Sequence, residues 1–120
     1  MSFIGIKKNI TQKDTAEKYI GDVSTYISNN YSNNIKVHDI AKYVNITGAY
    51  LFRLFKEYLH TSPQQFLINF RMEKACELLK DCNFTTGQLA RSIGYRDVLL
   101  FSKIFKKSFG ISPSDYRKQL

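Results

Sequence analysis

The sequence is poor in several residue types, and each shortage narrows the class of protein. It has no tryptophan and only two prolines, two cysteines and two histidines among 120 residues. His38 and His60 are far apart and lack the spacing of metal ligands, so we expect no metal site. Cys76 and Cys82 lie in a chain without a secretory signal. They are predicted to be free thiols in the cytoplasm.

Long apolar runs and catalytic groupings are also missing from the sequence. No segment approaches the roughly 18 consecutive apolar residues of a membrane span, so no membrane partner is expected. There is no Ser/His/Asp or Cys/His grouping, no paired-carboxylate motif and no glycine-rich phosphate loop. We therefore expect a protein that is not an enzyme and that uses no cofactor.

Negative charge is scarce relative to positive charge. Lys and Arg number 18 against 10 Asp and Glu, which gives a formal net charge of +8. An excess of this size favours an acidic partner, with nucleic acid first and an anionic membrane surface as the rival. Hydrophobic residues make up 43% of the chain, which is ample for a buried core.

What the sequence does contain is a segment that occurs twice, 50 residues apart. Residues 51–66 read LFRLFKEYLHTSPQQF, and residues 101–116 read FSKIFKKSFGISPSDY. The chain's two prolines fall at equivalent places in these copies. The likeness continues upstream, where residues 40–45 match residues 89–94, and one residue is added to the second copy in between. Such a repeat indicates that one structural unit was built twice.

Apolar residues recur at helical spacing along most of the chain, and no segment alternates as a strand would. A tail or linker is predicted for residues 1–14. Asn45 suits the left-handed residue that ends a helix. The fold class is therefore all-α, with about seven helices. Their expected ranges are about 15–31, 37–43, 48–59, 63–80, 85–94 and 98–108, with a short last helix from 113.

A short helix, a short turn and a second helix form the helix-turn-helix plan, which occurs here twice. The first unit is predicted over residues 15–61 and the second over residues 82–120. A linker helix over residues 62–81 joins them. The rows expected to face the core are Leu51, Phe55 and Leu59 on the second helix of the first unit, and Phe101, Ile104 and Phe105 on that of the second.

The opposite faces of these two helices are the candidate reading surfaces, because the second helix of such a unit lies in the DNA major groove. Arg53 and Lys103 are equivalent in the repeat, and so are Lys56 and Lys106. Arginine there can bond guanine through two hydrogen bonds. The alternative is that these are ordinary solvated charges. Matching positions in two units favour the reading role.

The residues from Gly94 to Lys118, GYRDVLLFSKIFKKSFGISPSDYRK, resemble the signature of the DNA-binding domain of the AraC/XylS family of transcription regulators. Residues 70–79, FRMEKACELL, resemble that family's linker helix. The likeness covers about residues 15–120. It implies a homeodomain-like fold in which the linker helix holds two recognition helices apart, so that both enter successive major grooves on one face of the DNA.

The resemblance also implies which positions read bases. Phe52, Val98 and Leu99 are apolar where the family more often has polar side chains. They are predicted to contact thymine methyl groups, which favours A·T-rich sites. The alternative is that Phe52 and Leu99 fold back onto the protein or meet a domain outside this chain. The full predicted base-reading set is Ala49, Phe52, Arg53, Val98, Leu99, Ser102 and Lys103.

Contacts to the DNA backbone are predicted for a separate set of residues. The Ser-Pro helix starts at Ser62 and Ser112 are candidates, since helix N-termini bind phosphate. Simple helix capping is the favoured alternative for both serines. For Arg71 we favour a structural bridge to an acidic core partner over a phosphate contact. The predicted phosphate set is Lys56, Ser62, Gln64, Arg96, Lys106, Ser112, Ser114 and Arg117.

These expectations converge on sequence-specific binding of double-stranded DNA by a cytoplasmic, bacterial transcription regulator. The resemblance implies an activator that contacts RNA polymerase, with any effector bound by a domain outside this chain. The signature in residues 94–118 is also similar to that of regulators of sugar utilisation. The unlike reading faces predict an asymmetric site of two different half-sites. The alternative function is a protein–protein interaction module that uses an exposed apolar patch of Phe52, Val98 and Leu99.

Overall fold

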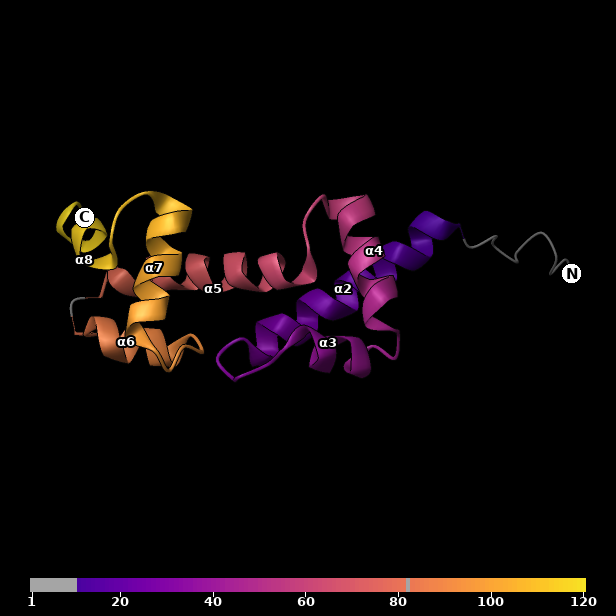
Figure 1. Ribbon diagram of the computed structural model, residues 1–120, viewed down its shortest axis with the longest axis horizontal. Coiled ribbons are helices and arrows are strands. Elements are labelled where there is room, and N and C mark those ends of the chain that lie inside the picture. Colours follow the sequence, from indigo (N-terminus) through magenta and orange to yellow (C-terminus); the bar gives the residue numbers. More distant parts are fainter. Residues whose placement is uncertain (1–10, 82) are drawn as a thin grey trace, which may run out of the picture.

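The computed structural model describes residues 11–81 and 83–120 and is drawn in Figure 1. Residues 1–10 of the predicted tail, and Cys82, lie outside the described residues. Every regular element in the described residues is a helix, which confirms the all-α class and the predicted order of the helices. The helices are α2 (Gln12–Asn30), α3 (Val37–Tyr43), α4 (Gly48–Leu59), α5 (Pro63–Leu79), α6 (Thr86–Ser92), α7 (Val98–Phe109) and α8 (Pro113–Lys118). None of these helices is long and apolar enough to cross a membrane.

Helix α2 begins three residues earlier than predicted, at Gln12 rather than Thr15. Thr11 and Asp14 form a capping box at its start. The Thr11 hydroxyl accepts a hydrogen bond from the Asp14 amide at 3.0 Å, and the Asp14 carboxylate accepts one from the Thr11 amide at 3.3 Å. The prediction that residues 12–14 belong to a tail is wrong, because this polar first turn is held by capping rather than by apolar packing.

Most other helices also begin at a side-chain cap. The side chains of Thr47, Ser62 and Thr85 each accept a hydrogen bond from a backbone amide three residues on. Helix α3 begins differently, since the ammonium group of Lys36 cannot accept. Instead the Asp39 carboxylate accepts from the Lys36 amide at 2.9 Å. Each helix therefore has a local reason to start where it does.

The repeat seen in the sequence is a repeat of backbone conformation. Helices α3 and α4 are joined by residues 44–47, and α6 and α7 by residues 93–97. Asn45 has φ 62° and its counterpart Gly94 has φ 103°, which confirms the left-handed conformation predicted for Asn45. After the second helix of each unit, His60 and Gly110 have φ of 57° and 83°.

The apolar side chains form two cores, and α5 contributes to both of them. Its first half contributes Leu67, with Phe66 and Phe70 at the edge, to a core shared with α2, α3 and α4. Its second half contributes Met72, Ala75 and Leu79 to a core shared with α6 and α7. The linker helix is thus a structural part of both units rather than a spacer between them.

The predicted core rows need one correction. Leu59 is 37% exposed, whereas Leu54 is buried together with Leu51 and Phe55. Leu54 and Leu51 lie three residues apart, on the same face of α4, and the last turn of the helix leaves the core. On α7, Phe101 and Phe105 are buried as predicted, and Ile104 packs against the same core while partly exposed.

The paired left-handed residues lead to a first prediction. Replacing His60 with glycine should raise the free energy of unfolding by about 0.5–1 kcal/mol, because glycine adopts positive φ without a Cβ clash. The matched control is Gly110→His, where a Cβ would meet nothing within 4 Å, so only backbone strain is added and stability should fall. Urea unfolding measures both, and a less stable His60→Gly variant would contradict the prediction.

Candidate nucleic-acid interface

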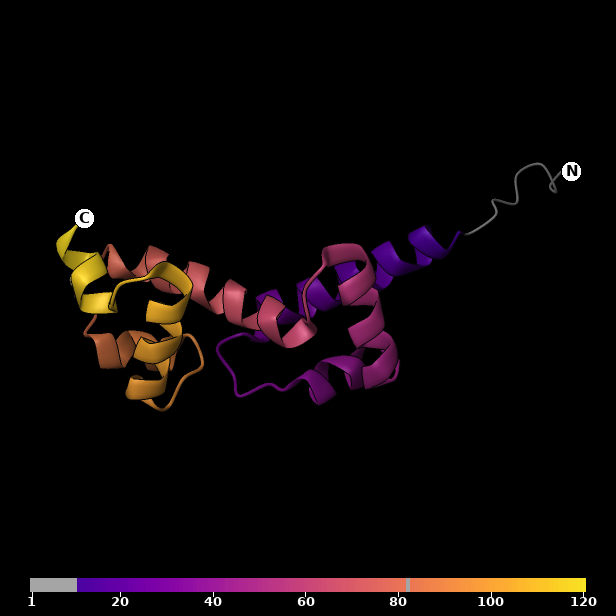
Figure 2. The same cartoon turned by 45° about the horizontal axis from the view of Figure 1, so that its top comes forward.

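The two candidate recognition helices, α4 and α7, lie at separate positions along the long axis of the molecule (Figure 1). In that view both run in nearly the same direction, and the turned view in Figure 2 keeps them apart, with α5 connecting the two regions. Each is the second helix of its helix-turn-helix unit. The fold therefore presents two equivalent helices in one chain.

On α4 the predicted reading residues are exposed together. Ala49, Phe52, Arg53 and Lys56 all reach solvent, and the side chain of Phe52 is 51% exposed. The Lys56 ammonium lies 5.9 Å from the centre of the Phe52 ring, close enough for a cation–π contact. The alternative in which Phe52 folds back onto the protein is therefore wrong for the described chain.

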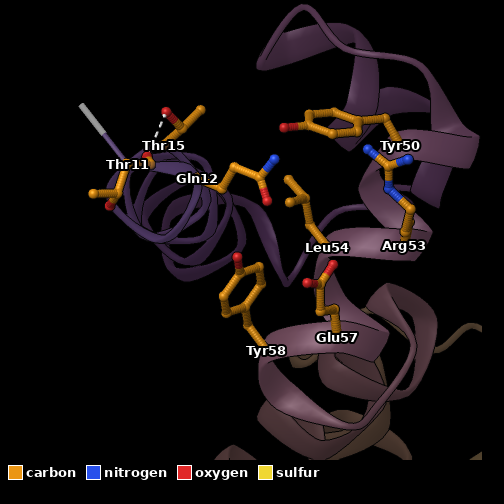
Figure 3. A pocket seen from close by; sticks show the side chains of 8 residues that line it. All are labelled: Thr11, Gln12, Thr15, Tyr50, Arg53, Leu54, Glu57 and Tyr58. Atoms are coloured by element: carbon orange, nitrogen blue, oxygen red, sulfur yellow. Dashed lines mark hydrogen bonds between the residues drawn. The ribbon is translucent and has the colours of Figure 1, made fainter. Parts of the chain in front are cut away.

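Arg53 lies at the edge of this face, beside a cavity of about 390 Å³ between α2 and α4. Its guanidinium carbon is 5.1 Å from the centre of the Tyr50 ring. Figure 3 shows that Glu57, one turn further along α4, belongs to the same cavity. The first turn of α2 forms another part of its wall. Arg53 thus rests on an aromatic ring, at one edge of the exposed α4 face.

On α7 the equivalent face has a different chemistry. Leu99 is 74% exposed, and Lys103 and Lys106 are exposed with it. Ser102 is half-buried. Where α4 carries Glu57, α7 carries Lys107, so the second face is the more basic one.

Val98 lies at the first position of α7 and has a mixed environment. It is half-buried and packs against the core of the second unit. Its methyl groups are therefore partly occupied by the protein. Phe52 and Leu99 belong to helices that Figures 1 and 2 show apart. The single apolar patch of Phe52, Val98 and Leu99 assumed for a protein–protein module is not formed.

The predicted phosphate residues fall into two groups. Ser62 and Ser112 act as caps, each accepting a hydrogen bond at 3.1 Å from a backbone amide at the start of α5 and α8. Gln64 and Ser114, next to these caps, are exposed, as is Arg96 in the turn before α7. The capping role favoured for the serines is thus present in the structure.

Two arginines with candidate phosphate roles are engaged inside the protein. Arg117 donates to the carbonyl oxygens of Leu79 at 3.1 Å and Asp81 at 3.2 Å, which closes the C-terminal end of α5. The sequence pattern did not indicate this contact, since its partners are backbone atoms 36 and 38 residues away. Arg71 is 7% exposed, and the partners described for it are also backbone carbonyls rather than the predicted acidic residue.

Among the described residues, Tyr116 on α8 is the side chain whose pKa is shifted from its ordinary value. A hydrogen bond to Cys76, with a smaller contribution from burial, raises the pKa of the Tyr116 phenol. Tyr116 also packs edge-on against Phe105, with ring centres 5.5 Å apart. The phenol therefore stays protonated at neutral pH and acts as part of the packing behind α7.

Two helix-turn-helix units, each exposing a basic second helix, define a double helix-turn-helix DNA-binding domain. Comparison with known families agrees with this class: a family model described as a helix-turn-helix domain matches residues 40–119. Relatives with this domain are bacterial transcription regulators. The chain belongs to the AraC-type helix-turn-helix family of DNA-binding transcription regulators.

Named relatives and a solved structure support this assignment. The chain is 42% identical over 106 residues to the lactose operon transcription activator of Staphylococcus xylosus, covering 88% of this chain and 38% of that protein. It is 40% identical over 112 residues to the raffinose operon regulatory protein RafR of Pediococcus pentosaceus, covering 93% and 40%. The C-terminal domain of AraT, a response regulator from Geobacillus stearothermophilus, superposes with TM-score 0.82 at 29% identity, covering 94% and 89%.

The exposed guanidinium of α4 gives a second prediction. Arg53→Ala should weaken binding to the preferred DNA site by about 1–3 kcal/mol and relax the preference at one base pair, because a side chain that bonds a base edge is lost. Titration of single-base variants of the site measures this. The matched control is Glu57→Gln on the same helix. An Arg53→Ala domain with unchanged base preference would remove Arg53 from the reading set.

The exposed ring of α4 gives a third prediction. Phe52→Ala should lower affinity chiefly for sites with thymine opposite the ring, because the contact with the thymine methyl group is lost. Binding to matched DNAs with uracil in place of that thymine should then be insensitive to the substitution. An equal loss on every sequence would instead indicate a packing role for Phe52.

Proposed function

We propose that this domain places α4 and α7 in successive major grooves on one face of double-stranded DNA. The observation that carries the proposal is that two equivalent helices in one chain expose equivalent faces of unlike composition. The 17 residues of α5 span about 26 Å at 1.5 Å per residue. With the width of the flanking units, that length suits two grooves about 34 Å apart.

The base-reading role is assigned to three residues on each helix. In the first unit these are Ala49, Phe52 and Arg53. In the second they are Leu99, Ser102 and Lys103, with Val98 a minor contributor because it is half-buried. Each of the three reading positions of α4 has a different residue at the equivalent position of α7. The proposed site therefore consists of two unlike half-sites, and one monomer reads both.

The backbone-contact role is assigned to exposed side chains around the two reading faces. Lys56 and Lys106 lie one turn beyond the base-reading residues on their helices. Gln64 and Ser114 stand in the first turns of α5 and α8, where free amide groups attract phosphate. Arg96 extends the set on the turn before α7. Ser62 and Ser112 are given a capping role at these helix starts instead of a phosphate contact. Arg117 is likewise given a structural role, because it bonds carbonyl oxygens at the end of α5.

For the whole protein we propose a cytoplasmic, bacterial transcription activator without catalytic activity. The chain spans about two fifths of the length of its two named relatives. Contact with RNA polymerase, and binding of an effector by a further domain, are therefore proposed for the whole protein rather than for this domain alone. The names of both relatives refer to sugar operons, which supports a sugar-utilisation operon as the target.

The fourth prediction tests the proposal directly. Selection from a random pool of duplex DNA should yield an asymmetric site with two different motifs, separated by about one helical turn. Affinity for that site should fall with salt at a slope of about −0.9 for each phosphate neutralised. Lys106→Ala should reduce this slope by about 1 and leave the selected sequence unchanged.

The outcomes of these measurements are distinct. Absence of sequence selection would overturn specific DNA reading, and recovery of a palindrome would overturn the asymmetric site. Association with a protein that does not depend on salt, together with no affinity for DNA, would support an interaction module instead.

A further inference from the structure

A buried arginine joins the two units at the middle of α5. Arg71 is 7% exposed. Its Nε donates to the carbonyl oxygen of Tyr31 at 3.0 Å, and its Nη2 donates to that of Asn33 at 2.9 Å. Its guanidinium carbon lies 5.1 Å from the centre of the Tyr95 ring. One side chain of α5 therefore contacts the end of α2, in the first unit, and the turn that follows α6, in the second.

The contact to α2 is favourable for a physical reason. Tyr31 is the C-terminal cap of α2. The last carbonyls of a helix have no partner inside the helix and carry the negative end of its dipole. The guanidinium of buried Arg71 forms a charge-assisted hydrogen bond with the Tyr31 carbonyl at this helix end, and its second bond reaches Asn33 in the loop that follows. Loss of the arginine would take this donor from the half-buried Tyr31 carbonyl, which is costly.

The second unit approaches the same point through Gly94. This residue has φ 103°, and a Cβ added to it would lie 2.6 Å from the Tyr31 carbonyl oxygen and 2.9 Å from Arg71 Nη2. Tyr31 itself packs against both cores, and its ring centre lies 5.3 Å from that of Phe70 on α5. The end of α2, the turn before α7 and the middle of α5 therefore meet around one guanidinium, without room for a further side-chain carbon at Gly94.

We propose that Arg71 is a positioning residue that sets the distance and rotation between α4 and α7, and hence the spacing required between the two half-sites. This inference rests on the proposed function. Helix α4 packs on α2, and α7 follows the turn that contains Gly94 and Tyr95. A junction that holds α2 and this turn together also holds the two reading helices in one relative orientation.

Half-site spacing is a sensitive readout of that orientation. Each added or removed base pair shifts the second half-site by about 3.4 Å and rotates it by about one tenth of a turn. A rigid domain must then deform the DNA or abandon contacts, and deformation is costly. A domain with a loosened junction adapts instead and discriminates less between spacers.

The experiment measures affinity for duplexes that carry the same two half-sites with the preferred spacer, or with a spacer one base pair shorter or longer. The wild-type domain should favour one spacer by about tenfold or more. Arg71→Lys keeps the positive charge but loses the planar fork that bonds both carbonyls. It should bring the three affinities to within about threefold, while binding to an isolated half-site stays unchanged.

Two further variants test the junction from other sides. Gly94→Ala should also reduce or shift the spacer preference, because its Cβ collides with the same carbonyl. Glu73→Gln, an exposed change two residues from Arg71 on α5, is the matched control and should keep the wild-type preference. Circular dichroism and thermal unfolding check that every variant is folded.

The results separate failure of this inference from failure of the proposed function. A wild-type domain without specific DNA binding would overturn the proposed function. A wild-type domain with a sharp spacer preference that folded Arg71→Lys retains would overturn the role of Arg71 alone. If Arg71→Lys does not fold, Tyr95→Leu decides, since it removes the ring beside the guanidinium: an unchanged spacer preference there overturns the inference.

Discussion

Both helix-turn-helix units depend on a single helix, α5, whose two halves are buried in different cores. Leu67 belongs to the first core and Met72, Ala75 and Leu79 to the second. Neither core is complete without this helix, so the two units cannot separate without exposing apolar surface. At the middle of α5 the contact is polar: Arg71 donates hydrogen bonds to carbonyl oxygens at the end of α2 and in the loop that follows it. The relative placement of the reading helices is a consequence of that shared helix.

The repeated scaffold and the varied reading faces have separate causes. Buried positions of α4 and α7 are equivalent, such as Leu51 with Phe101 and Phe55 with Phe105. Most of their exposed positions differ, although Lys56 and Lys106 match, because no core constrains a side chain that points to solvent. Exposed apolar residues at Phe52 and Leu99 on otherwise basic faces are compatible with DNA contact. Divergence on the exposed side gives one fold two different exposed surfaces.

Local signals in the sequence predicted most of the helices correctly, whereas contacts between distant segments were missed. Caps such as Thr47 act within three residues, so they can be read from the sequence alone. Arg117 and Arg71 bond backbone carbonyls 36 to 40 residues away. Carbonyls are common to every residue, so no residue type marks them as partners. Leu59 was misplaced because helical periodicity does not show where a helix leaves the core.

The sequence by itself determined the helical class, the two equivalent units and most of the residues exposed on each second helix, because periodicity, caps and a repeat are local properties. It also carried the family resemblance, in residues 94–118. Only the tertiary structure decided that α5 completes both cores and that Arg71, Tyr31 and Gly94 meet. Those contacts depend on how three separate segments pack in space, and packing of that kind leaves no periodic pattern in the chain.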